Sequence, residues 1–233
     1  MLNIRKFTFN PFQETTLLLW DETLRGAIAD PGCMDLEEEK VLTDYIAKEG
    51  IIPEAILLTH GHFDHIFGVT SLAARYGIPV HMAPEDEVIL RSNAELTRQF
   101  GLPDAPEDFA YEPLTDGQQI RIGDTVWEVI ATPGHTPGGV CFLDRADKVL
   151  VSGDTLFAGT IGRTDTPHGD YDKLIVSIMD KLMGLDGDVD AIPGHGPVTN
   201  IGHERTHNPF LQPWGEPEEE IDWDADGISL HGD

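Results

Sequence analysis

The sequence predicts a layered α/β sandwich in which mixed β-sheets are covered by helices. Short apolar runs with the length and composition of strands alternate with segments of helical periodicity through most of the chain. Several of these runs end in a glycine beside a histidine or an aspartate, as expected where a loop presents one side chain to a shared site. With 233 residues, 40% of them hydrophobic, the chain can bury one large core, so we expect a single domain over residues 1–210.

The first half of the chain predicts a β-meander followed by parallel strand–helix–strand units. A helix is expected at 35–48, because apolar residues recur at helical spacing, three glutamates stand in its first turn and Gly50 follows its end. The meander strands are expected at 2–9, 15–20 and 25–29, with a turn at Asn10 and Pro11. The later elements are a buried strand at 54–59, helices at 69–76 and 84–100, a strand at 78–82, a loop at 103–113 and a hairpin of 119–122 with 125–131.

In the second half of the chain, several predicted strands are followed closely by a histidine or an aspartate that could act chemically. Strands are expected at 126–131, 148–152 and 189–192, and the residues that follow them include His135, Asp154 and His195. A helix at 171–182 separates the last two strands. Cys141 lies in an apolar run and is interpreted as a buried strand residue. Cys33 is far from it in the chain, and the two form no C-x-x-C pattern, so a disulfide framework is not expected.

Charge and segment composition exclude several classes of partner. The formal net charge of −27 would repel a phosphodiester backbone or an anionic bilayer, which argues against a nuclease and against membrane binding. The N-terminus has no apolar signal region and no apolar run is long enough to span a bilayer, so a cytoplasmic protein is expected. Residues 216–226 contain seven acids and no lysine or arginine, and the stretch 211–233 is expected to be a solvated acidic tail.

The strongest chemical signal is the run from His60 to His65, which reads His-Gly-His-Phe-Asp-His directly after the predicted strand at 54–59. A strand that ends in His-x-His places both imidazoles at its mouth, where neutral ring nitrogens bind a borderline cation. Asp64 and His65 then turn toward a second cation. The run therefore predicts two metal ions rather than one.

Taken together, the motifs resemble the metallo-β-lactamase superfamily and, within it, the glyoxalase II-like hydrolases. The resemblance rests on H-x-H-x-D-H at 60–65, T-P-G-H-T around His135, S-G-D-T-L-F around Asp154 and G-H-G-P around His195, and it covers about residues 2–210. It implies a four-layer αββα sandwich with a metal groove at the sheet edges. It also implies two ligand groups and a bridging aspartate: His60, His62 and His135 for the first metal, Asp64, His65 and His195 for the second, and Asp154 between them.

Some of these residues also have an ordinary structural interpretation. His135 and His195 could cap turns, but their shared Pro-Gly-His setting favours ligation, and Asp154 could be a turn carboxylate after a glycine, although we favour the bridge. Arg163 and His168, in the loop that follows Asp154, either face the substrate or are exposed loop residues. The remaining histidines fit no ligand pattern and are interpreted as structural or surface residues: His81, His203, His207 and His231.

The activity implied by the resemblance is hydrolysis of thioesters such as S-lactoylglutathione. Two divalent cations share a water and lower its pKa, and Asp64 and Asp154 would hold this nucleophile as catalytic carboxylates. A thiolate departs without a strong general acid, whereas an amide nitrogen must be protonated, so thioesters fit better than peptides. Histidine and aspartate ligands suit zinc, iron and manganese, and two zinc ions are the expected cofactor.

Three other activities of the same fold, and a binding module without activity, are the alternatives to this one. Persulfide dioxygenases are the main alternative and would use one iron on His60, His135 and Asp154. β-Lactamases of this fold lack the bridging carboxylate and carry an export signal, and the transfer-RNA nucleases need a surface that tolerates polyanions. A binding module without activity would not be expected to keep the full ligand set.

The C-terminal stretch predicts weak affinity for the thiol part of the substrate. Two-domain glyoxalase II enzymes carry a helical segment after G-H-G-P that supplies basic and aromatic contacts to glutathione. In this chain the last lysine or arginine after His195 is Arg205, so no counterpart of that cationic segment is expected.

Overall fold

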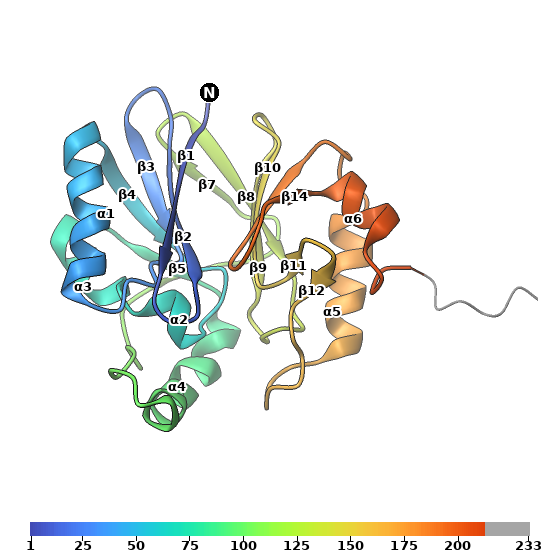
Figure 1. The fold of residues 1–233 in the computed structure, drawn as a ribbon. Coiled ribbons are helices and arrows are strands. Elements are labelled where there is room, and N and C mark those ends of the chain that lie inside the picture. The colour runs from blue at the N-terminus through green and yellow to red at the C-terminus, as the bar shows by residue number, and fades with distance from the viewer. Residues whose placement is uncertain (213–233) are drawn as a thin grey trace, which may run out of the picture.

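Two six-stranded mixed sheets face each other between two layers of helices in the computed structural model, which describes residues 1–212 (Figure 1). The predicted αββα sandwich is therefore confirmed. The predicted acidic stretch at 216–226 lies outside the described residues. Among the described helices, none is long and apolar enough to cross a membrane.

The first sheet has the strand order β1-β2-β3-β4-β5-β6. Its β1, β2 and β3 pair antiparallel as the predicted meander, and β3 to β6 pair parallel because helices connect them. The strands are β1 (Asn3–Phe9), β2 (Glu14–Trp20), β3 (Arg25–Ala29), β4 (Ile52–Leu57), β5 (Val80–Met82) and β6 (Glu112–Pro113).

The second sheet has the order β14-β13-β10-β9-β8-β7. Only β10 and β13 pair parallel, and the chain between them forms α5 (Tyr171–Ser177) and a π-helical turn, Ile178–Leu182. The strands are β7 (Gln119–Ile122), β8 (Thr125–Ala131), β9 (Val140–Asp144), β10 (Val149–Gly153), β13 (Asp190–Pro193) and β14 (Thr199–Asn200). A separate two-stranded sheet pairs β11 (Leu156–Phe157) with β12 (Thr160–Ile161).

Helices cover the outer faces of both sheets and one end of the sandwich. The first sheet is covered by α1 (Leu36–Glu49) and α3 (Val69–Tyr76), and the second by α5 and α6 (Ile201–His207) (Figure 1). The helices α2 (Phe63–Ile66) and α4 (Glu87–Phe100) lie near the lower end in this view. The side chain of Asp35 caps α1 by accepting from the backbone of Glu37 and Glu38, as the acidic start of that helix predicts.

Alternating side chains of the central strands enter different cores. In β4, Ala55 and Leu57 face the second sheet, whereas Ile56 packs with Leu42 of α1 and Leu72 of α3. Both faces of this strand are therefore buried, which explains why it reads as a continuous apolar run rather than an alternating one. The predicted metal-binding motif begins at His60, shortly after this strand ends, so the burial of the strand fixes the position of the first histidines.

Several predicted boundaries differ from the structure. The predicted helix at 84–100 begins with a 3₁₀ turn, Pro84–Asp86, and the predicted helix at 171–182 is α-helical only up to Ser177. The predicted loop at 103–113 ends in the short strand β6. Proline lacks an N–H and fits the first turn of either a 3₁₀-helix or an α-helix, so Pro84 did not indicate which type begins here. The elements α2, β14 and α6 are too short to show periodicity.

Candidate metal centre

The predicted ligands lie where four strands end at the same edge of the sandwich. His60 follows β4, His135 follows β8, Asp154 follows β10, and His195 follows β13. Within the second sheet, β8 and β10 both pair antiparallel with β9, and β13 pairs parallel with β10. These three strands therefore point the same way, and their carboxyl ends present their loops to one shared site.

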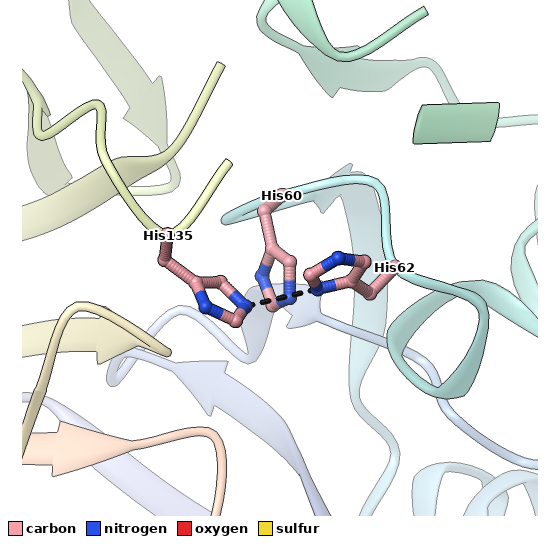
Figure 2. Close-up of side chains that lie close together, drawn as sticks. All are labelled: His60, His62 and His135. Atoms are coloured by element: carbon pink, nitrogen blue, oxygen red, sulfur yellow. Dashed lines mark hydrogen bonds between the residues drawn. The ribbon is translucent and has the colours of Figure 1, made fainter. Parts of the chain in front are cut away.

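Three histidines form the first group of candidate metal donors. The Nε2 atom of His135 lies 2.9 Å from the Nδ1 atom of His62, and one ring nitrogen of His60 completes a set whose atoms are all within 4.8 Å of one another (Figure 2). The rings point toward one another from two loops (Figure 2). The Nε2 atom of His60 is buried and has no hydrogen-bond partner in the described part of the chain.

The second group contains Asp64, His65 and His195. The Nε2 atoms of His65 and His195 are 3.2 Å apart, and the Oδ2 atom of Asp64 lies 3.4 Å from Nε2 of His195 and 3.8 Å from Nε2 of His65. His65 is fully buried, and Asp64 is 8% exposed. The short helix α2 brings Asp64 and His65 away from the strand axis and toward the loop after β13.

Asp154 lies between the two groups. Its Oδ2 atom is 3.6 Å from Nε2 of His135, and its Oδ1 atom is 3.6 Å from Nε2 of His65. The Oδ2 atom is also 3.7 Å from Nε2 of His195. The carboxylate thus faces donors of both groups, which is the position that a bridging ligand requires.

The donor set fits metal ions better than it fits hydrogen bonds among its own members. His135 and His195 each have Nδ1 within hydrogen-bond distance of a backbone carbonyl oxygen, that of Arg163 at 2.8 Å and that of Phe12 at 3.0 Å. If Nδ1 carries the proton, Nε2 keeps its lone pair for the site. The Oδ1 atom of Asp154, like Nε2 of His60, is buried without a hydrogen-bond partner in the described residues. Cations would satisfy these atoms.

Electrostatics favour neutral histidines in the first group. Burial, and after it the neighbouring His65 and other imidazoles, lower the pKa of His60 well below its ordinary value. Burial and then His135 lower the pKa of His62 to about 3. Both shifts favour the uncharged ring, in which a nitrogen lone pair is available to a cation.

The surroundings of the second group favour a positive charge. Burial opposes ionisation of Asp64, but the charge of His65 and a hydrogen bond with His195 lower its pKa below the ordinary range. Burial also opposes the charged form of His65, yet Asp154, Asp64 and Asp30 raise the pKa of His65 well above its ordinary value. This cluster of carboxylates stabilises a cation, which again fits a bound metal.

Comparisons with known proteins support the family that the motifs indicate. A family model described as the metallo-beta-lactamase superfamily matches residues 10–195. The chain belongs to this superfamily. It is similar to hydroxyacylglutathione hydrolase GloC of Haemophilus influenzae, with 37% identity over 215 residues that cover 90% of this chain and 98% of the relative.

Two solved structures resemble this member of the superfamily over most of its length. BLEG-1, a B3 metallo-beta-lactamase, is 35% identical with a TM-score of 0.83, and the match covers 91% of this chain and 100% of BLEG-1. TTHA1623 in a di-iron-bound form is 35% identical with a TM-score of 0.80, and the match covers 89% and 100% of the two chains. With its clustered histidine and aspartate donors, the protein is a metallo-hydrolase of the superfamily.

Asp30 belongs to the candidate metal centre, although no sequence motif marks it. It is buried after β3, and its carboxylate accepts hydrogen bonds from the backbone N–H of Thr59 at 2.7 Å and from the Thr59 hydroxyl at 2.5 Å. Its Oδ2 atom also lies 3.1 Å from Nδ1 of His65, and Asp30, His60 and His65 form a further close group of donor atoms. Its position beside Pro31 and Gly32 at a strand end was the available signal.

Glycines permit the close packing of the strand ends around these donors. Gly153 has a positive φ of 47°, and a Cβ atom there would clash with the side chain of Thr59. A Cβ atom on Gly194 would clash with the carboxylate of Asp154 and the ring of His65. Space therefore requires glycine before the candidate ligands Asp154 and His195, and the positive φ favours it before Asp154 as well.

Asp86 joins the two loops that carry the first group of donors. Its Oδ2 atom accepts hydrogen bonds from the backbone N–H of Gly61 at 2.7 Å and from the hydroxyl of Thr136 at 2.9 Å. Its Oδ1 atom accepts from the backbone N–H of Gly138 at 2.5 Å. Gly61 lies between two of the histidines, and Thr136 follows the third, so the fully buried Asp86 fixes the distance between the two loops.

We expect Asp86→Ala to lower the occupancy of the first metal site and to reduce the free energy of unfolding by about 3 kcal/mol or more. The substitution leaves buried donors without an acceptor, and each costs roughly 1–3 kcal/mol. Metal content and chemical denaturation measure the two effects. The matched control is Glu85→Ala, an exposed acid in the same 3₁₀ turn, which should change neither. Full metal content in Asp86→Ala would contradict the positioning role.

A pocket of about 660 Å³ opens beside the donors. Arg163 and His168 both line this pocket. The sequence had left open whether they face the substrate or lie in an exposed loop. The guanidinium of Arg163 is held by Asp165 through contacts of 2.8 and 3.1 Å. The opposite wall comes from α4 and from aromatic residues of other segments: Phe12, Phe63, Ile89, Ser92, Glu95, Leu96, Gln99 and Phe100.

The remaining histidines and the cysteines lie away from the donor groups. His81 is buried, with its Nδ1 atom 3.6 Å from Glu112, and His203 and His207 are exposed on α6. His231 lies outside the described residues. Cys33 and Cys141 are both buried and free, and Cys141 lies in β9, the strand in which it was expected.

Proposed function

We propose that this protein is a dinuclear metal hydrolase that cleaves hydroxyacyl thioesters of the S-lactoylglutathione type. The observation that carries the proposal is the position of Asp154, because its carboxylate oxygens face donors of both groups at 3.6 Å. A site for a single metal ion would not require a second complete set of donor residues beside the Asp154 carboxylate. The similarity to GloC of Haemophilus influenzae, a hydroxyacylglutathione hydrolase, supports the choice of substrate.

The residues of this chain would hold and orient the reactants. A pair of divalent metals, with zinc as the first expectation and iron or manganese as alternatives, supplies hydroxide at neutral pH and stabilises negative charge on the substrate carbonyl oxygen. His60, His62 and His135 would hold one ion, and Asp64, His65 and His195 the other. Asp64 lines the pocket and lies beside His65 and His195, so as a ligand its carboxylate would also orient the attacking water.

The leaving group favours a thioester over an amide. A thiol has a pKa near 8.5, so its thiolate departs without being protonated first, whereas an amide nitrogen requires an acid. The similarity to BLEG-1 nevertheless favours β-lactam hydrolysis as a second candidate function. The persulfide dioxygenase alternative needs only His60, His135 and Asp154, and the complete second group argues against it.

Metal content and three substrates test the proposal together. We expect about two metal ions per purified chain and hydrolysis of S-lactoylglutathione with a kcat/KM of at least about 10⁴ M⁻¹s⁻¹. Nitrocefin hydrolysis should be slower by orders of magnitude. A single iron with oxygen consumption on glutathione persulfide would overturn the proposal in favour of the dioxygenase. Faster turnover of nitrocefin than of thioesters would overturn it in favour of the β-lactamase.

A further inference from the structure

One wall of the pocket beside the metal donors is aromatic and aliphatic. The ring of Phe12 meets the edges of Phe63 and Phe100, with centroid distances of 5.2 and 5.6 Å. Phe63 and Phe100 are themselves 6.0 Å apart. Ile89 and Leu96 extend this surface along α4. The three rings and the two aliphatic side chains are called the apolar wall below.

The apolar wall follows from the periodicity of α4. Ile89, Leu96 and Phe100 recur at spacings of seven and four residues and therefore lie on one face of the helix. Ile89 is buried, whereas Phe100 is 59% exposed at the helix end. Phe100 thus forms the exposed rim of the wall. The same pocket is also lined by the donors His62, Asp64 and His135. A substrate bound at the donors would cover this rim.

Away from the predicted metal ligands, the charges of the pocket lining do not favour an anionic substituent. Apart from the predicted metal ligands, Asp154 included, the Asp, Glu, Lys and Arg residues of the lining are Arg163, Asp165 and Glu95. Arg163 is already paired with Asp165, and Glu95 lies on α4 beside the wall. A carboxylate on the substrate would therefore meet no unpaired guanidinium or ammonium among these lining residues, and it would be repelled by Glu95.

We propose that the apolar wall is a specificity subsite that binds an uncharged aryl or alkyl group of the thioester substrate. This inference rests on the proposed function and adds a preference within its substrate class, for hydroxyacyl thioesters that carry an apolar substituent. The substituent is carried on either the acyl or the thiol side, and the two sources are distinguished by matched substrates. Phe100 contributes most at the rim, because it is the most exposed ring of the cluster.

Three uncharged thioesters test the subsite. S-Lactoyl-N-acetylcysteamine is the small reference, S-(3-phenyllactoyl)-N-acetylcysteamine adds an aryl group on the acyl side, and the S-lactoyl ester of benzyl mercaptan adds one on the thiol side. Each kcat/KM is divided by the rate of hydroxide-catalysed hydrolysis of the same ester. We expect one aryl ester to exceed the reference by roughly tenfold or more, the discrimination typical of apolar pockets, and that ester identifies the side.

Variants connect the preference to the wall. Phe100→Ala should reduce the ratio of aryl to reference kcat/KM by about fivefold, and Phe100→Leu should retain most of it because an apolar side chain remains. The matched control is Phe210→Ala, which removes a ring that is 42% exposed and is not part of the pocket lining. It should leave the ratio at the wild-type value. Phe100 is exposed, so its truncation leaves the buried cores intact.

The outcomes separate the subsite from the proposed function. Wild-type protein that hydrolyses no thioester, S-lactoylglutathione included, would overturn the proposed function and the subsite with it. If thioesters are hydrolysed but the ratio of aryl to reference kcat/KM is near one, or is left unchanged by Phe100→Ala, the subsite alone is overturned. A ratio well above one that falls in Phe100→Ala but not in Phe210→Ala would support it.

Discussion

Asp154→Ala is expected to lower kcat/KM for thioester hydrolysis by about a thousandfold or more and to reduce the metal content from about two ions per chain to about one. Asp154 faces His135 of the first donor group and His65 of the second, each at 3.6 Å. Without this carboxylate, two cations at the site would repel each other with less negative charge between them. Metal analysis and steady-state kinetics on the same preparation measure both losses.

A surface substitution controls for the general effect of removing an aspartate. Asp188 is exposed and pairs with Lys148 at 2.6 Å, and solvent screens an exposed pair of this kind so that it contributes little to stability. Asp188→Ala should therefore keep wild-type metal content and turnover. Circular dichroism establishes that both variants are folded. Two bound metals and near-normal turnover in Asp154→Ala would show that the carboxylate does not bridge.

The donor residues were predictable because each stands in a short local motif. His60 to His65 are adjacent in the chain, and His135 and His195 each follow Pro-Gly at a predicted strand end. Placing them required only that the strand ends meet at one edge of the sandwich, and the alternation of strands and helices indicated this. The predicted fold class followed from the same alternation.

The supporting residues depend on contacts that no local pattern reveals. Asp30 reaches Thr59 because β3 and β4 pair in parallel with Ala29 opposite Leu57, a register that the sequence does not specify. Asp86 bonds to Gly61 and Gly138, which are 25 and 52 residues away in the chain. Long-range hydrogen bonds of this kind become visible only when the loops are placed relative to one another.

The apolar wall was hidden for a similar reason. Phe12 precedes β2, Phe63 begins α2 and Phe100 ends α4, so three separate segments supply the rings. The helix at 84–100 was predicted, but which of its faces would meet the metal groove depended on the 3₁₀ turn before it and on the anchoring of Asp86. Substrate preference is consequently the property of this site that sequence motifs describe least.

His65→Ala is the substitution that best distinguishes a dinuclear hydrolase from a mononuclear enzyme of the same fold. His65 belongs to the second donor group, whereas the mononuclear alternative uses His60, His135 and Asp154. For the hydrolase, we expect His65→Ala to bind about one metal and to lose thioester hydrolysis by roughly a hundredfold or more, because the nucleophile loses one of its two cations. His60→Ala should remove activity under either mechanism, so it serves as the comparison.

The ring of His65 is fully buried, so its loss must be separated from a loss of folding. His65→Ala leaves a cavity and removes the contact with Asp30, and both effects lower stability. The matched control is His81→Ala, because it also removes a buried imidazole but one that lies outside the donor groups. If His65→Ala keeps thioester hydrolysis at the level of His81→Ala while holding one metal, the second ion is not needed for catalysis. If His65→Ala instead loses both the second metal and thioester hydrolysis, while its thermal unfolding midpoint equals that of His81→Ala, the second ion takes part in the reaction.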